Sequence, residues 1–162
     1  TVGRVHRGFK AEVDELWPMV QEDLLRKTNL GKTLWFCGHS LGAAMATIMA
    51  SRCFHEVELN DPIELYTYGS PRVGWKKYCN SLGVVHHRWR NNKDIVTKVP
   101  LWIMGYRHDG KLHYITSDNK IGKPSFVDWA KGMWQGIKNK RIDNIADHDI
   151  QAYHDNIDKA LK

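Results

Sequence analysis

The sequence predicts an α/β fold in which a mostly parallel sheet is flanked by helices. Three observations lead to this: short runs rich in β-branched and aromatic residues, helical segments between these runs, and no internal repeat. Parallel strands need a long crossover connection, usually a helix, so strands that alternate with helices indicate a parallel sheet. The length suits a single domain over residues 1–162.

The first predicted helix is marked by an apolar stripe at steps of three and four. Its members are Phe9, Val13, Leu16, Trp17, Val20, Leu24 and Leu25. Apolar runs at 33–37, 63–68 and 84–90 predict strands, and segments 41–54 and 75–81 predict helices. Residues 112–116 are expected to form an added strand paired with 106–107 across a turn at 109–110. Two further helices are predicted at 126–137 and 145–161.

The composition, 42% hydrophobic and 26% charged, is that of a soluble globular protein. No apolar run approaches the roughly 18 residues of a membrane span. No signal peptide is present in the chain as given, which begins at Thr1, so the compartment is left open. Three cysteines are too few for a disulfide framework.

Residues 38–42 match the pattern G-x-S-x-G, in which a serine lies on a sharp turn between a strand and a helix. Such a turn crowds the residues two before and two after the serine, so neither Gly38 nor Gly42 is expected to have room for a side chain. His39, Ser40 and Leu41 lie between them. The helix predicted from Leu41 directs its free N–H groups toward Ser40, which makes Leu41 the expected oxyanion donor. The alternative is a glycine-rich turn with a passive serine.

A serine nucleophile needs a histidine base and a carboxylate that orients the histidine. On a sheet of this kind the expected chain order is serine, acid, histidine. Asp94 follows the end of a predicted strand and is the expected acid. Asp61 precedes its strand, and Asp109 falls in the predicted hairpin turn.

Nine histidines compete for the role of base. Those that follow Asp94 are His108, His113, His148 and His154. The first two flank the predicted hairpin, where a solvated or structural role is expected, and His154 falls within the last predicted helix. His148, at the start of that helix, is the expected base.

Several segments, in their order along the chain, resemble the class 3 lipases, a family with the α/β-hydrolase fold. The matching segments are Val5–Phe9, Gly38–Ala44, Tyr66–Gly74 and Asn91–Val96, with a weaker match at Asp147-His148 and Tyr153. The resemblance implies a catalytic triad of Ser40, Asp94 and His148 that hydrolyses carboxylic esters of acylglycerols.

The chain departs from the family pattern in two ways. Ala43 stands where the family commonly has glycine, which is a small change. The family's strand and loop before Val5, which supply a second oxyanion donor and often a lid, would precede Thr1. The resemblance therefore implies either an N-terminally truncated domain without the first strands and lid, or a different loop that supplies the donor.

Other functions remain open at this point. A phospholipase A1 or a feruloyl-type esterase would use the same triad, and a non-catalytic basic binding module could derive from the same fold. No cofactor is expected. The His86-His87 pair, and His108 with His113, lack a complete metal-ligand spacing, so no metal is expected. Cys37 is not expected to be catalytic, because strand alternation predicts that it is buried.

The net charge of +6 is concentrated in two clusters that contain tryptophan, 86–93 and 131–141. Such clusters can bind nucleic acid or anionic lipid, although a solvated face is the commoner explanation. We expect a basic face that helps an esterase meet an anionic lipid surface, and we regard nucleic acid as the less favoured partner. The apolar residues 101–104 are expected either to line an acyl pocket or to pack in the core.

Overall fold

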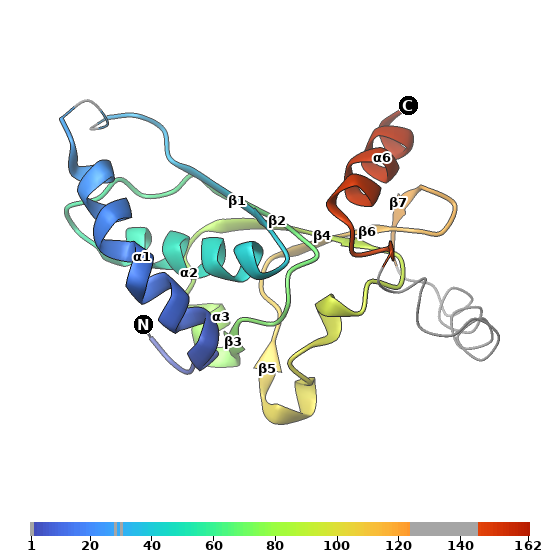
Figure 1. Ribbon diagram of the computed structural model, residues 1–162, viewed down its shortest axis with the longest axis horizontal. Coiled ribbons are helices and arrows are strands. Elements are labelled where there is room, and N and C mark those ends of the chain that lie inside the picture. The colour runs from blue at the N-terminus through green and yellow to red at the C-terminus, as the bar shows by residue number, and fades with distance from the viewer. Residues whose placement is uncertain (1, 28, 30, 124–145) are drawn as a thin grey trace.

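The computed structural model describes residues 2–27, 29, 31–123 and 146–162. Within these residues the centre is a five-stranded sheet with strand order β1-β2-β4-β6-β7 (Figure 1). Its strands are β1 (Trp35–His39), β2 (Glu64–Tyr68), β4 (Val85–Asn91), β6 (Lys111–Ile115) and β7 (Ile121–Gly122). The first four pair in parallel and β7 pairs antiparallel with β6. The predicted mostly parallel sheet is confirmed.

Helices lie on both sides of this sheet, with α1, α2 and α3 on one side and α6 on the other (Figure 1). The helices are α1 (Arg7–Leu25), α2 (Leu41–His55), α3 (Lys76–Asn80) and α6 (Ile150–Leu161), with short 3₁₀ helices η1 (Val96–Lys98) and η2 (Trp102–Met104). Two short strands, β3 (Gly74–Trp75) and β5 (Tyr106–Arg107), form a separate antiparallel pair. None of the helices within the described ranges combines the length and apolar character needed to cross a membrane.

The core lies between α1, α2 and one face of the sheet. α2 contributes mainly small side chains, which allow its backbone to lie close to the strands, and α1 contributes Val13 and Trp17 from its apolar stripe. The largest buried cluster includes Val13, Ala44, Ile48, Ala50, Leu65, Val73, Tyr78 and Leu82. Burial of these apolar surfaces fixes the start of α2 against the end of β1.

The parallel register brings three strand ends to one edge of the sheet. His39 of β1 pairs with Tyr68 of β2, which pairs with Trp89 of β4. The loops that follow these strands therefore meet at the same edge, as is usual for ligand sites in parallel sheets.

The predicted hairpin across residues 109–110 is wrong. β6 pairs in parallel with β4, and β5 pairs with β3 instead. Contacts from β4 explain the difference: the Asp109 carboxylate lies 3.2 Å from Nδ1 of His86, and the Asp109 carbonyl accepts a 3.1 Å hydrogen bond from Nε of Arg88. These bonds hold the turn against β4, so the chain continues alongside that strand.

The predicted burial of Cys37 is also wrong. Strand alternation holds along β1, but with the opposite phase: Phe36 packs against the core, whereas Cys37 and Trp35 are exposed. The helices α1 and α2 cover the face that carries Phe36, which leaves Cys37 on the other face.

Of the two basic clusters, the first does not form a solvated face. His86 and Arg88 point from β4 into the interior and are buried. The second cluster, 131–141, and the predicted helix 126–137 lie outside the described residues.

Candidate active site

Ser40 occupies the turn between β1 and α2 alone, since β1 ends at His39 and α2 begins at Leu41. Its backbone has φ 57° and ψ −126°, a conformation that residues other than glycine rarely adopt. A serine at this position would ordinarily cap the helix with its hydroxyl, but Ser40 makes no such bond. Its Oγ lies 2.7 Å from Nε2 of His148 instead.

The two glycine positions of the pattern differ in whether they have room for a side chain. A Cβ on Gly38 would lie 2.4 Å from the carbonyl oxygen of Gly42, so position 38 has no room for a side chain. A Cβ on Gly42 would meet nothing within 4 Å. The expectation that Gly42 must lack a side chain is therefore wrong, because it is the backbone of Gly42 that approaches Gly38.

His148 lies in the turn just before α6, and its ring bridges Ser40 and Asp94. Nδ1 lies 3.0 Å from Oδ2 and 3.1 Å from Oδ1 of Asp94. With these partners the neutral ring donates from Nδ1 to the carboxylate and accepts the serine proton at Nε2. His154, the competing histidine, has a side chain that is 74% exposed and faces Asp155. The structure thus brings Ser40, Asp94 and His148 together and leaves His154 outside.

Asp94 is completely buried, and its carboxylate is held on several sides. The backbone N–H of Val96 donates to Oδ1 at 2.9 Å, and the Tyr153 hydroxyl donates to Oδ2 at 2.6 Å. Burial, and then the nearby Asp94 charge, raise the pKa of Tyr153 far above its usual value. The phenol therefore stays protonated and remains a hydrogen-bond donor to the acid.

The turn that carries His148 is tied to the strand ends. His39 donates from Nε2 to the His148 carbonyl at 2.6 Å, and the two rings lie 4.7 Å apart. Asn91 donates to the Asp147 carbonyl at 3.1 Å, and the Asp147 carboxylate accepts the backbone N–H of Lys93 at 3.1 Å. These bonds fix the base against the loop that carries the acid.

Gly69, which follows β2, leaves the space that the acid and base occupy. Its φ is +60°, and a Cβ there would lie 2.9 Å from both Oδ2 of Asp94 and Nδ1 of His148. We did not predict a site role for Gly69, for Tyr153 or for the His39 bond. Two signals were available in the sequence: the Gly69-Ser70-Pro71 turn after a strand adjacent to β1, and the place of Tyr153 in the resemblance to class 3 lipases.

The backbone N–H of Leu41 belongs to the first turn of α2. N–H groups in a first turn have no acceptor within their own helix and lie at its positive end. Leu41 can thus offer its N–H to an anion that forms beside Ser40.

Other histidines in the described part of the chain contact groups outside the candidate triad. His108 donates from Nε2 to the Thr97 carbonyl at 2.6 Å, and Nδ1 of His87 lies 3.0 Å from Nε2 of His113. Among the described residues, no group of three or more His, Cys, Asp or Glu side chains is arranged to hold a metal ion.

Comparison with known proteins gives a consistent match. The family model for lipase (class 3) matches residues 1–104. A secreted mono- and diacylglycerol lipase A from Penicillium cyclopium is 36% identical over 112 residues, which cover 64% of this chain and 36% of that protein. Phospholipase A1 EG1 from Oryza sativa subsp. indica is 38% identical over 68 residues, covering 39% and 15%.

Among solved structures, Rhizomucor miehei triacylglyceride lipase superposes with a TM-score of 0.64 at 28% identity. The match covers 73% of this chain and 51% of that one, and the chain spans about a third of the Penicillium lipase. The family match covers more than half of the chain, and the superposition agrees with a mostly parallel sheet flanked by helices. The chain therefore belongs to the class 3 lipase family and has the α/β-hydrolase fold.

Proposed function

We propose that the chain is a serine carboxylic ester hydrolase that cleaves acylglycerol esters, with Ser40 as nucleophile, His148 as base and Asp94 as acid. The observation that carries the proposal is the continuous contact from Ser40 Oγ to His148 Nε2 at 2.7 Å and from Nδ1 to the Asp94 carboxylate at 3.0 Å. A hydroxyl in such contact is activated at neutral pH.

In the first half of the reaction, Ser40 Oγ attacks the ester carbonyl carbon while its proton passes to Nε2 of His148. The carbonyl oxygen becomes an oxyanion, which the N–H of Leu41 stabilises. When the tetrahedral intermediate collapses, the bond to the alcohol breaks and His148 returns the proton to the departing oxygen. The acyl group remains on Ser40.

In the second half, water takes the place of the alcohol. His148 accepts a proton from the water as it attacks the acyl carbon, and returns that proton to Ser40 Oγ as the carboxylic acid leaves. Asp94, held by Val96 and Tyr153, stabilises the imidazolium that forms in each half.

The substrate class rests on what the relatives are named for. The similarity to a secreted mono- and diacylglycerol lipase favours acylglycerols as the substrates of this chain. We propose that the ester is presented in a lipid phase. The similarity to a phospholipase A1 favours a second candidate, hydrolysis of phospholipid esters by the same triad. Both candidates use the same atoms and differ only in the leaving alcohol.

The test is ester hydrolysis by the full chain and by Ser40→Ala, with Ser81→Ala as a matched control outside the site. Loss of a triad nucleophile lowers kcat by about 10⁴- to 10⁶-fold, whereas the control should keep full activity. A folded Ser40→Ala variant that still hydrolyses a nitrophenyl ester overturns the proposal. Triacylglycerol, phospholipid and soluble short esters, compared in parallel, separate the two substrate classes.

A further inference from the structure

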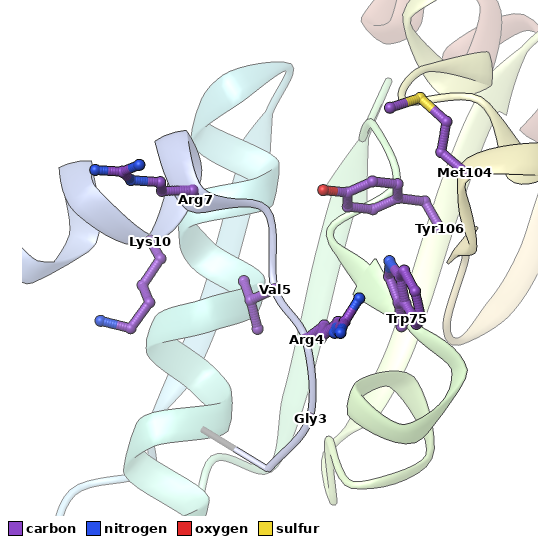
Figure 2. Close-up of a pocket in the computed structure, with 8 residues that line it drawn as sticks. All are labelled: Gly3, Arg4, Val5, Arg7, Lys10, Trp75, Met104 and Tyr106. Atoms are coloured by element: carbon purple, nitrogen blue, oxygen red, sulfur yellow. The ribbon is translucent and has the colours of Figure 1, made fainter.

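A hollow lies between the N-terminal end of α1 and the β3–β5 pair (Figure 2). A second hollow shares Gly3, Arg4 and Trp75 with the first and lies beside α3 and the β3–β5 pair. Their volumes are about 580 and 430 Å³, and neither is lined by an acidic residue. The basic side chains that line them define what we call the cationic patch: Arg4, Arg7, Lys10, Lys76, Lys77 and Arg107. The positive charge therefore gathers on a surface that neither basic cluster in the sequence indicated.

Arg4 lines both hollows and is held in place. Its guanidinium lies 4.4 Å from the centre of the Trp75 ring, and its carbonyl accepts a 2.8 Å hydrogen bond from the backbone N–H of Trp75. Figure 2 shows Arg4 beside Trp75, with Arg7 and Lys10 on the opposite side and the Tyr106 hydroxyl directed into the space between. Arg7 and Lys10 thus come from one side of the hollow, and the opposite side is aromatic, with Arg4 against the Trp75 ring.

Most of these charges are not neutralised within the molecule. Lys10 pairs with Asp14, but in the described part of the chain Arg4, Arg7 and Lys76 form no ion pair with an acidic side chain. Arg7 also lies in the first turn of α1, where the helix dipole disfavours a positive charge. Such an arrangement costs stability unless an anion binds there.

An exposed apolar turn adjoins the patch. Its four consecutive side chains, Leu101, Trp102, Ile103 and Met104, are 53%, 64%, 76% and 58% exposed. Met104 also lines the larger hollow, and Arg107 donates to the Trp102 carbonyl at 2.6 Å. The apolar turn does not pack in the core, and a contiguous exposed patch of this kind indicates a surface that binds something apolar.

We propose that the cationic patch and the apolar turn form one docking surface for an anionic phospholipid membrane. The basic side chains contact the lipid phosphates, and the apolar turn inserts between the acyl chains. The proposal deepens the proposed function, on which it rests for the lipid nature of the substrate phase.

Nucleic acid is the other polyanion to consider, because Trp75 and Tyr106 beside basic residues could stack on single-stranded bases. The apolar turn decides between them. The ring of Trp102 could stack on a base, but Leu101, Ile103 and Met104 present no hydrogen-bonding group and no ring. The exposure of these three side chains is useful to a lipid surface and not to nucleic acid.

The docking surface is connected to the candidate active site. The apolar turn follows Asp94 through η1, and Arg72 donates to the Pro100 carbonyl at 2.8 Å and to the Lys98 carbonyl. A membrane bound at the turn therefore lies next to the loop that carries the acid.

The test is co-sedimentation with vesicles, in a Ser40→Ala background so that the lipid stays intact. Vesicles of phosphatidylcholine alone are compared with an equal mixture of phosphatidylcholine and phosphatidylglycerol. The patch variant is Arg4→Gln with Arg7→Gln. The matched control is Lys27→Gln with Lys159→Gln, which removes the same charge from beyond the far end of α1 and from α6.

We expect tighter binding to the mixed vesicles than to phosphatidylcholine alone. Each basic residue near an anionic membrane contributes about fivefold, so the patch variant should bind the mixed vesicles about 25-fold more weakly. The control should bind as the parent does, and Ile103→Ser should weaken binding to both compositions. Equal binding by the patch variant and the control overturns the proposal. A single-stranded oligonucleotide that binds more tightly than the mixed vesicles, and is lost in the patch variant, also overturns it.

Docking and hydrolysis can fail separately. The patch variant with Ser40 intact should hydrolyse a soluble nitrophenyl ester as fast as the parent. Vesicle binding with the expected losses supports docking even if the chain hydrolyses nothing, a result that counts against the proposed function alone.

Discussion

The hydroxyl of Tyr153 donates a 2.6 Å hydrogen bond to Oδ2 of Asp94, and its oxygen accepts the backbone N–H of Asn91 at 2.9 Å. Tyr153 belongs to α6, directly after the turn that carries His148, whereas Asp94 follows β4. This single phenol therefore links the element behind the base to the loop of the acid.

Tyr153→Phe is expected to weaken the site without unfolding the protein. A buried hydrogen bond to a charged group contributes about 1.5–3 kcal/mol, and its loss leaves one carboxylate oxygen of Asp94 with a partner fewer. We expect kcat/KM for a soluble ester to fall about 10- to 100-fold, because Asp94 then holds His148 less firmly. Steady-state kinetics and urea unfolding measure the two effects.

Tyr78→Phe is the matched control for that variant. Tyr78 is also buried, and its hydroxyl contacts the Thr47 carbonyl at 3.5 Å and the Ser51 side chain, away from the site. Its activity should equal that of the parent. Equal activity losses in the two variants would show that Tyr153 acts through general stability alone.

The two late histidines should behave differently. His148→Ala removes the group in contact with Ser40 and should lower kcat by about 10⁴- to 10⁶-fold. His154→Ala removes an exposed ring and should leave kcat unchanged. The assignment of the base is wrong if His154→Ala abolishes hydrolysis and His148→Ala does not.

Gly69→Ala should disrupt the site sterically. The added methyl would lie 2.9 Å from atoms of Asp94 and His148, so one of them must shift, and kcat should fall by about 100-fold or more. Gly31→Ala is the control, since Gly31 also has a positive φ, of +81°, but a Cβ there meets nothing within 4 Å. Both variants carry the same kind of backbone strain, so a loss of activity confined to Gly69→Ala assigns the effect to the collision.

The buried His108 should make the protein less stable in acid. Burial, followed by the Arg88 charge, lowers the pKa of His108 to about 3. In the unfolded chain the same histidine binds its proton near pH 6.5. The contribution of His108 to the free energy of unfolding is therefore fully present above pH 6.5 and is lost as the pH falls from there toward 3. The free energy of unfolding should drop by about 2 kcal/mol between pH 7 and pH 5 through this group.

Urea unfolding of His108→Gln at both pH values checks this, with the exposed His154→Gln as control. The His108 variant should lose about 2 kcal/mol less than the parent on going to pH 5, and the control should lose as much as the parent. An unchanged pH dependence in His108→Gln contradicts the account of this side chain.

The features that sequence reasoning predicted are those set by local pattern and chain order. Apolar runs and helical periodicity give the strands and helices to within a few residues, as at 41–54 against Leu41–His55. Chain order and strand ends select Ser40, Asp94 and His148, and in the structure His148 lies within hydrogen-bond distance of both Ser40 and Asp94.

The features that it missed depend on packing between distant segments. Whether Cys37 is buried or exposed depends on which face of the sheet the helices cover. The sequence of a five-residue strand does not reveal which face that is. The strand that pairs with β6 is decided by Asp109 and its contacts on β4. The contact of Tyr153 with Asp94 joins positions 59 residues apart, and nothing in the local pattern around Tyr153 indicates it.

The most direct test of the account is covalent labelling of the folded chain with a fluorophosphonate, followed by peptide mass spectrometry. In this reaction Ser40 Oγ bonds to phosphorus, fluoride leaves, and His148 accepts the serine proton. The account predicts one adduct, on Ser40, that is absent in Ser40→Ala and forms orders of magnitude more slowly in His148→Ala. A folded sample with no adduct, or with its adduct on another serine, would contradict it.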